Sequence, residues 1–195
     1  MPFSQSSQLS TIVQFAEQLQ PMSVLDLGIG MGQYGFLLRT NLENANLFEV
    51  NGAEGRLRPR EGWRVRIDGV EGCAGYMTPV HTYAYNNVII SNVLDALPKI
   101  ADNSYDFVMG IDILEHFTTA DGLVFLDHCK RVASRATLIS TPKIFHAQEV
   151  EANPFENHRS VWSAEELATK GFTNILPNDE SWIAIYSSSA ADTPR

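Results

Sequence analysis

The chain has 195 residues, of which 44% are hydrophobic, and 23 acidic against 14 basic residues give it a formal net charge of −9. This acidic balance repels a phosphate backbone, so nucleic acid is a disfavoured partner. No run reaches the ~18 apolar residues of a membrane-spanning helix, and the first residues lack the pattern of a signal peptide, which predicts a cytoplasmic protein without membrane insertion. The two cysteines, Cys73 and Cys129, have no paired spacing and the histidines no triad spacing, so neither a disulfide nor a metal site is predicted.

The first predicted element is an amphipathic helix within residues 1–20, where QLSTIVQFAEQL has apolar side chains at helical spacing and Pro21 follows as a stop. We expect it to cover one face of a sheet. A buried strand, SVLDL, comes next, and the glycine-rich stretch GIGMGQYG leads into a second helix. Residues 45–62 are rich in Gly and Arg and are predicted to be an irregular insertion before a strand in WRVRIDGVEG. The arginines there either contact an anionic ligand or form a solvated surface.

Strands and helices continue to alternate toward residue 142. We expect strands in VIIS, YDFVMGID and ATLIST, with helices around LDALPKI and ADGLVFLDHCKRVA. A polar, lid-like loop is predicted at 142–161. Ser163 and Glu166 then match a capping box at a helix start, and Gly171 suits its end. Two final apolar runs, FTNIL and SWIAIYS, predict an antiparallel hairpin, and residues 188–195 are predicted to be a disordered tail.

This order of elements predicts a single α/β domain over residues 1–187. Alternating strands and helices build a parallel sheet with right-handed crossovers, to which the terminal hairpin adds an antiparallel strand. The fold class is therefore a Rossmann-like three-layer sandwich around a seven-stranded, mostly parallel sheet.

The glycine-rich stretch predicts a ligand site between the first strand and its helix. Glycine allows tight turns and a close approach of the backbone, and amides at a helix start face whatever binds there. The spacing of Gly30, Gly32 and Gly35 also satisfies G-x-G-x-x-G, which is typical of nicotinamide and flavin sites. Asp26, two residues before Gly28, is unusual in such a site and natural where the ligand carries an amino group or where the loop itself needs a hydrogen-bond acceptor.

The stretch VLDLGIGMGQYG resembles the first motif of the class I S-adenosylmethionine-dependent methyltransferases. That motif is an acidic residue followed by G-x-G-x-G, matched here by Asp26, Gly28, Gly30 and Gly32. The resemblance extends from residue 24 to residue 186, and QYGFLLR, RIDGVEG and NPFENHRSVWSAEEL are similar to a bacterial small-molecule subgroup. It implies S-adenosylmethionine as cofactor and a terminal strand inserted antiparallel into the sheet.

The resemblance also implies a carboxylate at the end of the second strand that accepts hydrogen bonds from ribose. We assign this role to Glu71, followed by Gly72, because RVRIDGVE has the composition of a strand. Glu54 lies nearer the usual spacing and remains the alternative. Asn92, with Val93, lies where the family contacts adenine, although an aspartate is more common there.

The segment DNSYDFVMGIDILEHF resembles the fourth-strand region of small-molecule methyltransferases. Ile111 and Asp112 fall at the carboxyl end of that strand, where open α/β sheets bind ligands. Glu115 is expected at the mouth of the same site, on the substrate side.

Two histidines are candidates for the acceptor side of the site. His116 is either a general base or a residue that caps and packs the next helix. His158 and Arg159 in ENHRSVW either contact the acceptor or close the loop through polar contacts.

These observations predict in-line methyl transfer from S-adenosylmethionine onto an unidentified small or glycan/lipid-linked acceptor. Oxygen is favoured over nitrogen as the acceptor atom because the (D/N)PP(Y/F) signature of amino-group methylation is absent. STPK replaces the Asp-Asn pair of the magnesium-dependent type, so a magnesium-assisted reaction is not predicted. The rivals are a catalytically silent S-adenosylmethionine-binding protein and an NAD-dependent oxidoreductase. A monomer and a homodimer both fit.

Overall fold

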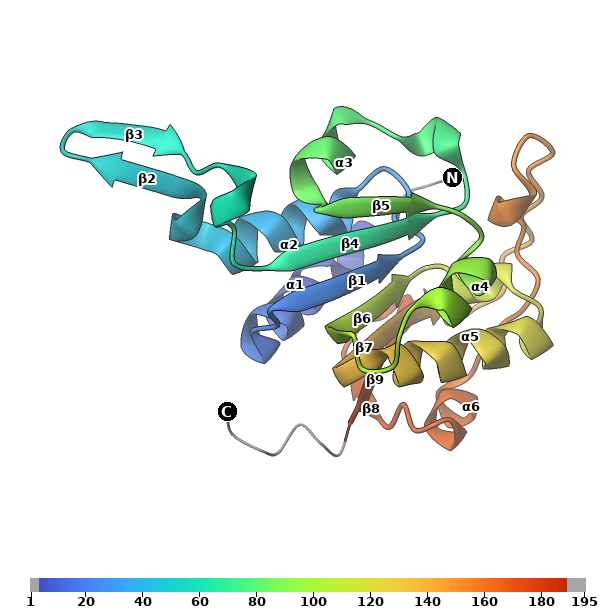
Figure 1. The fold of residues 1–195 in the computed structure, drawn as a ribbon. Coiled ribbons are helices and arrows are strands. Elements are labelled where there is room, and N and C mark those ends of the chain that lie inside the picture. Colours follow the sequence, from blue (N-terminus) through green and yellow to red (C-terminus); the bar gives the residue numbers. More distant parts are fainter. Residues whose placement is uncertain (1–3, 189–195) are drawn as a thin grey trace.

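The structure, a computed structural model, describes residues 4–188 and is built around a seven-stranded sheet of order β5-β4-β1-β6-β7-β9-β8 (Figure 1). The strands are β1 (Ser23–Leu27), β4 (Arg66–Glu71), β5 (Asn87–Ile90), β6 (Tyr105–Ile111), β7 (Ala133–Pro142), β8 (Asn174–Leu176) and β9 (Ser181–Ser187). The first five are mutually parallel, whereas β9 runs antiparallel to both of its neighbours, β7 and β8. The predicted fold class and the terminal hairpin are thereby confirmed. Residues 1–3 of the predicted helical segment and residues 189–195 of the predicted tail lie outside the described residues.

Helices cover both faces of the sheet. They are α1 (Leu9–Leu19), α2 (Gln33–Glu43), α3 (Pro79–Ala84), α4 (Val93–Ala96), α5 (Thr119–Val132) and α6 (Ala164–Thr169). Side chains from α1, α2 and α3 share one core cluster, and those from α4, α5 and α6 share the other, so these are the two helical layers (Figure 1). Strand alternation feeds both clusters, because Val24 of β1 lies in the first and Leu25 in the second.

The start of α6 shows how local sequence sets an element boundary. The Ser163 hydroxyl accepts from the Glu166 amide at 3.2 Å, and the Glu166 carboxylate accepts from the Ser163 amide at 2.8 Å. This is the predicted capping box, and it is confirmed. Gly171, just beyond the helix, has a φ of +92°, the left-handed conformation expected of it.

The prediction of an irregular insertion over residues 45–62 is wrong for its middle. Strands β2 (Phe48–Asn51) and β3 (Glu54–Leu57) form an antiparallel hairpin that projects away from the main sheet (Figure 1). The two-residue loop is Gly52-Ala53, and Gly52 has a φ of +65°, so the glycine at the first loop position is a hairpin signal that the high Arg and Gly content obscured. The hairpin is exposed along both strands.

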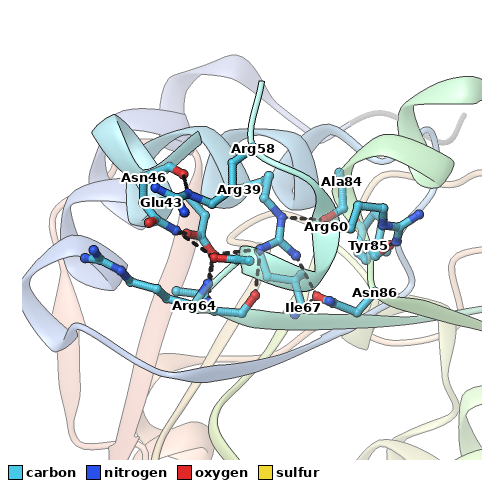
Figure 2. A network of polar contacts seen from close by, with 12 residues as sticks. Arg39, Glu43, Asn46, Arg58, Arg60, Arg64, Ile67, Ala84, Tyr85 and Asn86 are labelled. Carbon is cyan, nitrogen blue, oxygen red and sulfur yellow. Dashed lines mark hydrogen bonds and ion pairs between the residues drawn. The ribbon is translucent and has the colours of Figure 1, made fainter. Parts of the chain in front are cut away.

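A buried polar network joins the end of α2 to the start of β4 (Figure 2). Arg39, fully buried, donates to Glu43 at 3.2 Å, to the carbonyl oxygens of Val65 at 2.6 Å and Ala84 at 3.0 Å, and to Asn86 Oδ1 at 2.6 Å. Glu43 in turn accepts from the backbone amides that lead into β4. The network ties the helix to the sheet at the amino ends of the strands.

The arginines of the insertion are engaged within the protein. Arg56 and Arg58 pair with Glu49 on the hairpin, and Arg66 pairs with Asp68. Because these arginines already have acidic partners, the interpretation as a solvated surface is favoured over that of an anion-binding site. Among residues 4–188, no helix combines the length and apolarity that crossing a bilayer requires.

Candidate active site

A cavity of about 600 Å³ opens at the carboxyl ends of the parallel strands. All predicted site residues except Gly32 line it: Asp26, Gly28, Gly30, Glu71, Gly72, Asn92, Val93, Ile111, Asp112, Glu115, His116, His158 and Arg159. Glu54, the alternative to Glu71, lies in the exposed hairpin and is not among the lining residues. The topology of the sheet explains the convergence, because the ends of parallel strands meet at one edge.

The glycine loop forms one wall of the cavity. Gly28 has a φ of +75°, a conformation that residues with a Cβ rarely adopt, so the backbone favours glycine there. A Cβ would also meet Ile113 Cδ1 at 2.7 Å and push the end of that side chain aside. Gly32 has a φ of +83° and begins α2 as its N-cap, which explains its position behind the loop rather than on the cavity wall. The Gly30 carbonyl lies 3.0 Å from His81 Nε2, and because His81 Nδ1 accepts from the Thr78 amide, Nε2 carries the proton and donates to the loop.

Asp26 lies behind this loop and is only 3% exposed. Its Oδ2 accepts from the Tyr85 hydroxyl at 2.7 Å, and the same hydroxyl accepts from the Gly35 amide at 3.1 Å. Burial raises the pKa of Asp26 to about 7, the Tyr85 hydrogen bond opposes that rise, and the Glu71 charge adds to it. Tyr85 thus connects the carboxylate to the start of α2.

Glu71 ends β4 and connects two segments of the site. One carboxylate oxygen accepts from the Gly30 amide at 2.9 Å and the other from the Cys73 amide at 2.8 Å. Burial raises its pKa, whereas these backbone hydrogen bonds lower it. A carboxylate oxygen has a second lone pair, so Glu71 retains acceptor capacity toward ligand hydroxyls.

Asn92 and Val93 line the cavity at the end of β5. The Asn92 side-chain oxygen accepts from the Leu94 amide at 2.9 Å and caps α4. This cap fixes the side chain, so the Nδ2 hydrogens and the second lone pair of the Asn92 oxygen remain to meet a ligand.

Asp112 follows β6 with a φ of +48°, a left-handed conformation that aspartate tolerates better than most residues. Its Oδ2 accepts from Gln8 Nε2 at 2.6 Å. Ser140 Oγ lies 2.7 Å from Asp112 Oδ1 and 2.6 Å from Gln8 Oε1, and its single proton can be donated to only one of these oxygens at a time. Burial raises the pKa of Asp112, whereas the hydrogen bonds from Ser140, the Gln5 amide and Gln8 lower it.

Glu115 and His116 lie on the short turn Leu114–His116, directly after β6. Glu115 is 4% exposed, and burial together with the Asp112 charge raises its pKa to about 8. The Arg159 amide donates to the Glu115 carbonyl at 2.7 Å, which joins this turn to the loop of residues 143–161. His116 and His158 lie edge to face with ring centroids 4.9 Å apart, and burial lowers the pKa of His116.

The loop of residues 143–161 also reaches the opposite side of the cavity. The Tyr76 hydroxyl donates to Glu156 at 2.9 Å and accepts from Asn153 at 2.8 Å, and Phe155 packs on the backbone of Gly72. The loop therefore spans the cavity from the segment after β4 to the turn after β6. The orange loop and the ends of β1 and β4 lie on the same side of the molecule (Figure 1).

Sequence reasoning missed several residues that shape this cavity. Tyr34, Tyr76 and Phe155 line it, and His81 and Tyr85 support the wall from α3 and its end. These residues carry no motif, and an aromatic residue reads as ordinary core when its partner is distant in sequence. Tyr85 is an example, because its two hydrogen-bond partners lie 50 and 59 residues away.

The fold has many solved counterparts, although no family model and no curated protein sequence matches the chain. The magnesium protoporphyrin IX methyltransferase of Synechocystis PCC 6803 with bound SAM is 17% identical, with a TM-score of 0.56 over 93% of this chain and 78% of that one. A SAM-dependent methyltransferase from Archaeoglobus fulgidus is 14% identical, with a TM-score of 0.59 over 92% and 94%. Another from Aquifex aeolicus is 19% identical, with a TM-score of 0.53 over 93% and 94%.

The chain thus has the fold of the class I S-adenosylmethionine-dependent methyltransferases. The expected fold is confirmed at this level, and identities below 20% carry the comparison no further than the fold.

Proposed function

We propose that this protein binds S-adenosylmethionine in the cavity and transfers its methyl group to an oxygen of a small or glycan/lipid-linked acceptor. The charge of the cavity wall carries the proposal. Among the described residues that line it are six carboxylates, Asp26, Glu71, Asp112, Glu115, Asp121 and Glu156, and one basic residue other than histidine, Arg159. S-adenosylmethionine carries positive charge on its sulfonium and amino groups, which outweighs the charge of its one carboxylate. A cation beside the wall favours the ionised form of carboxyl groups whose pKa burial raises, so the wall and the cofactor attract each other when the cofactor binds.

The same charge weighs against the oxidoreductase. A dinucleotide brings a pyrophosphate to the glycine loop, where Asp26 and Glu71 lie with raised pKa values that an added anion would raise further. The glycine spacing alone fits both ligands, so the carboxylates discriminate between them.

Each wall has a distinct task in this proposal. The glycine loop admits the cofactor, Asp26 supports the loop or its methionine end, Glu71 accepts from the ribose hydroxyls, and Asn92 with Val93 frames the adenine. Ile111 and Asp112 also contact the cofactor, at the end of β6. Glu115 and Arg159 contact the acceptor.

When bound, the cofactor supplies an activated methyl group on a sulfonium. The chain's own task is to align the acceptor oxygen with it and to exclude water, and such positioning is worth ~7–11 kcal/mol of barrier. The oxygen–carbon bond forms as the sulfur–carbon bond breaks, and the acceptor proton passes to His116 or His158. A base of this kind adds about 10²–10⁴-fold.

Calorimetry with S-adenosylmethionine, its demethylated product and NAD tests the proposal. We expect micromolar binding of the first two and none of NAD. Glu71→Gln should weaken cofactor binding about tenfold or more, since one charge-assisted hydrogen bond is worth ~1.5–3 kcal/mol. Glu54→Gln is the matched control outside the cavity.

Three results would contradict parts of this proposal. Binding of NAD alone overturns the methyltransferase, and an unchanged affinity of the Glu71→Gln variant removes the ribose role. Cofactor binding without methyl transfer to any offered hydroxyl compound would favour the catalytically silent binding protein.

A further inference from the structure

Three potential metal ligands converge at the acceptor end of the cavity. Glu115, His116 and His158 each offer one ligand atom, and these three atoms lie within 4.8 Å of one another. Two come from the turn after β6 and the third from the loop of residues 143–161. Ligand atoms around a zinc-sized ion lie about 3–3.5 Å apart because the bonds are ~2.1 Å long, so a modest contraction would close the site.

Both imidazole rings are oriented by backbone carbonyl groups. His158 Nδ1 lies 2.6 Å from the His146 oxygen, and His116 Nδ1 lies 3.3 Å from the Asn157 oxygen. A carbonyl oxygen only accepts, so Nδ1 of each ring carries the proton and Nε2 of each neutral ring holds the lone pair. Metal-binding histidines characteristically donate their other N–H to such a group.

The Glu115 carboxylate lacks a partner of opposite charge. It is buried, it accepts from the Thr141 hydroxyl at 3.1 Å, and no lysine or arginine within residues 4–188 forms an ion pair with it. A buried carboxylate that stays ionised is normally paired with a cation or bound to a metal. Glu115 has no paired cation, and the two imidazole nitrogens beside it are the further ligands that a metal site needs.

We propose that Glu115, His116 and His158 bind a divalent transition-metal ion of the zinc, cobalt or iron(II) type. Two imidazoles and one carboxylate suit these ions, whereas magnesium and calcium prefer oxygen ligands throughout. No metal site is predicted from the sequence, and this proposal differs from that prediction. His158 is separated from the other two ligands by α5, β7 and most of the loop of residues 143–161, and therefore no spacing rule detects the site.

Three protein ligands leave coordination positions open toward the cavity. In a role that rests on the proposed methyl transfer, the ion would bind the acceptor hydroxyl and lower its pKa. The hydroxyl proton would then pass to water instead of to His116 or His158, whose Nε2 lone pairs would hold the ion, and the sulfur–carbon bond would break as the oxygen attacks the methyl carbon. An acceptor with a hydroxyl beside a second oxygen would fill two such positions. Metal binding itself does not depend on this role.

The test is metal binding without cofactor or acceptor. Full-length protein stripped with a chelator is titrated with Co²⁺, followed by its visible absorption and by calorimetry, and then with Zn²⁺ in competition. We expect one ion per chain, a rise in melting temperature, and at least about tenfold weaker binding in the Glu115→Gln, His116→Gln and His158→Gln variants. His128→Gln on α5, outside the cavity lining, is the matched control and should bind like the parent.

Equal Co²⁺ affinity in the parent and the His158→Gln variant would overturn the site, as would no binding or a preference for Mg²⁺. His158 lies on a loop and is half-buried, so of the three variants His158→Gln is expected to disturb folding least. Circular dichroism checks that it is folded. If the protein binds S-adenosylmethionine but no metal, only the metal site is contradicted. If it binds metal but not S-adenosylmethionine, the proposed methyl transfer is contradicted and the metal site is not.

Discussion

The two ends of the parallel sheet bury charge in opposite ways. At the amino ends of the strands, Arg39 lies against Glu43 and donates to two backbone carbonyls and an amide oxygen (Figure 2). Burial lowers the pKa of Arg39 to about 10, which leaves it charged at neutral pH. At the carboxyl ends, Asp26, Asp112 and Glu115 are buried among hydroxyl and amide groups, and burial raises the pKa of each.

The difference distinguishes charged groups that stabilise the fold from charged groups that bind a ligand. A buried charge with a counter-charge and backbone hydrogen-bond partners is compensated within the chain. Carboxylates without a counter-charge leave an acidic cavity, which costs stability when they ionise and favours a cationic occupant. Charge compensation, rather than burial, marks the functional end of the molecule.

Removal of Arg39 should produce the largest loss of stability. Arg39→Met leaves the Glu43 carboxylate buried without its cation and removes a donor from the carbonyl oxygens of Val65 and Ala84, at a cost of ~3–5 kcal/mol. Urea unfolding at pH 7 measures this free energy. The control is Arg58→Met, whose half-buried side chain pairs with Glu49 and should cost about 1 kcal/mol or less. Similar losses in both variants would contradict the structural role of the buried network.

The opposite sign is expected at Asp26. Its pKa is about 7 in the folded chain, compared with 3.8 for an ordinary aspartate, so the folded state holds the proton more tightly. The stability that this proton supplies is complete below pH 4 and is lost as the pH rises through 7. Asp26→Asn removes that loss, and its stability relative to the parent should improve by ~2–4 kcal/mol from pH 4 to pH 8.

Thermal and urea unfolding across this range measure the Asp26 effect. The amide oxygen of the asparagine still accepts from the Tyr85 hydroxyl, so the substitution tests charge rather than the hydrogen bond. A difference between the two proteins that does not change with pH would show that Asp26 ionises normally in the folded state.

The sequence predicted the sheet well because its signals are local. The alternation of apolar runs with helical periods, the Ser163–Glu166 capping box and the final hairpin each lie within a short stretch of chain. The glycine loop is likewise local, and the strand ends around it follow from parallel topology. The β2–β3 hairpin was missed although its Gly52-Ala53 turn is also local, since exposed strands lack the apolar alternation on which the prediction relied.

For the candidate site, the sequence predicted most of the lining residues but not the contacts between them. Glu71 and Asn92 lie at the ends of their strands, as parallel topology predicts. Tyr85, by contrast, reaches Asp26 from a helix end, and Tyr76 contacts the loop of residues 143–161 across the cavity. The meeting of His116 with His158 is also a tertiary event. Such pairings depend on how loops pack over the sheet, which no periodicity encodes.

Loss of the Tyr85 hydroxyl should have an intermediate effect. Tyr85→Phe leaves the buried Gly35 amide without its acceptor and Asp26 without a donor, at a cost of ~1–3 kcal/mol. Because this hydrogen bond lowers the pKa of Asp26, its loss raises that pKa further, and the variant should lose more stability at pH 8 than at pH 5. Urea unfolding at both pH values measures this, and a larger loss at pH 5 would contradict the assigned coupling.

The exposed pair on the hairpin should have the smallest effect and sharpens the comparison from the other side. Arg56 and Glu49 lie 2.8 Å apart, closer than Arg39 and Glu43 at 3.2 Å, yet the Arg56 side chain is 80% exposed. Water already solvates these charges, so Arg56→Ala should change the free energy of unfolding by about 0.5 kcal/mol or less, and less still in 1 M salt. Urea unfolding at two salt concentrations measures both values. A loss as large as that of Arg39→Met would mean that distance, and not burial with full compensation, decides what an ion pair contributes in this protein.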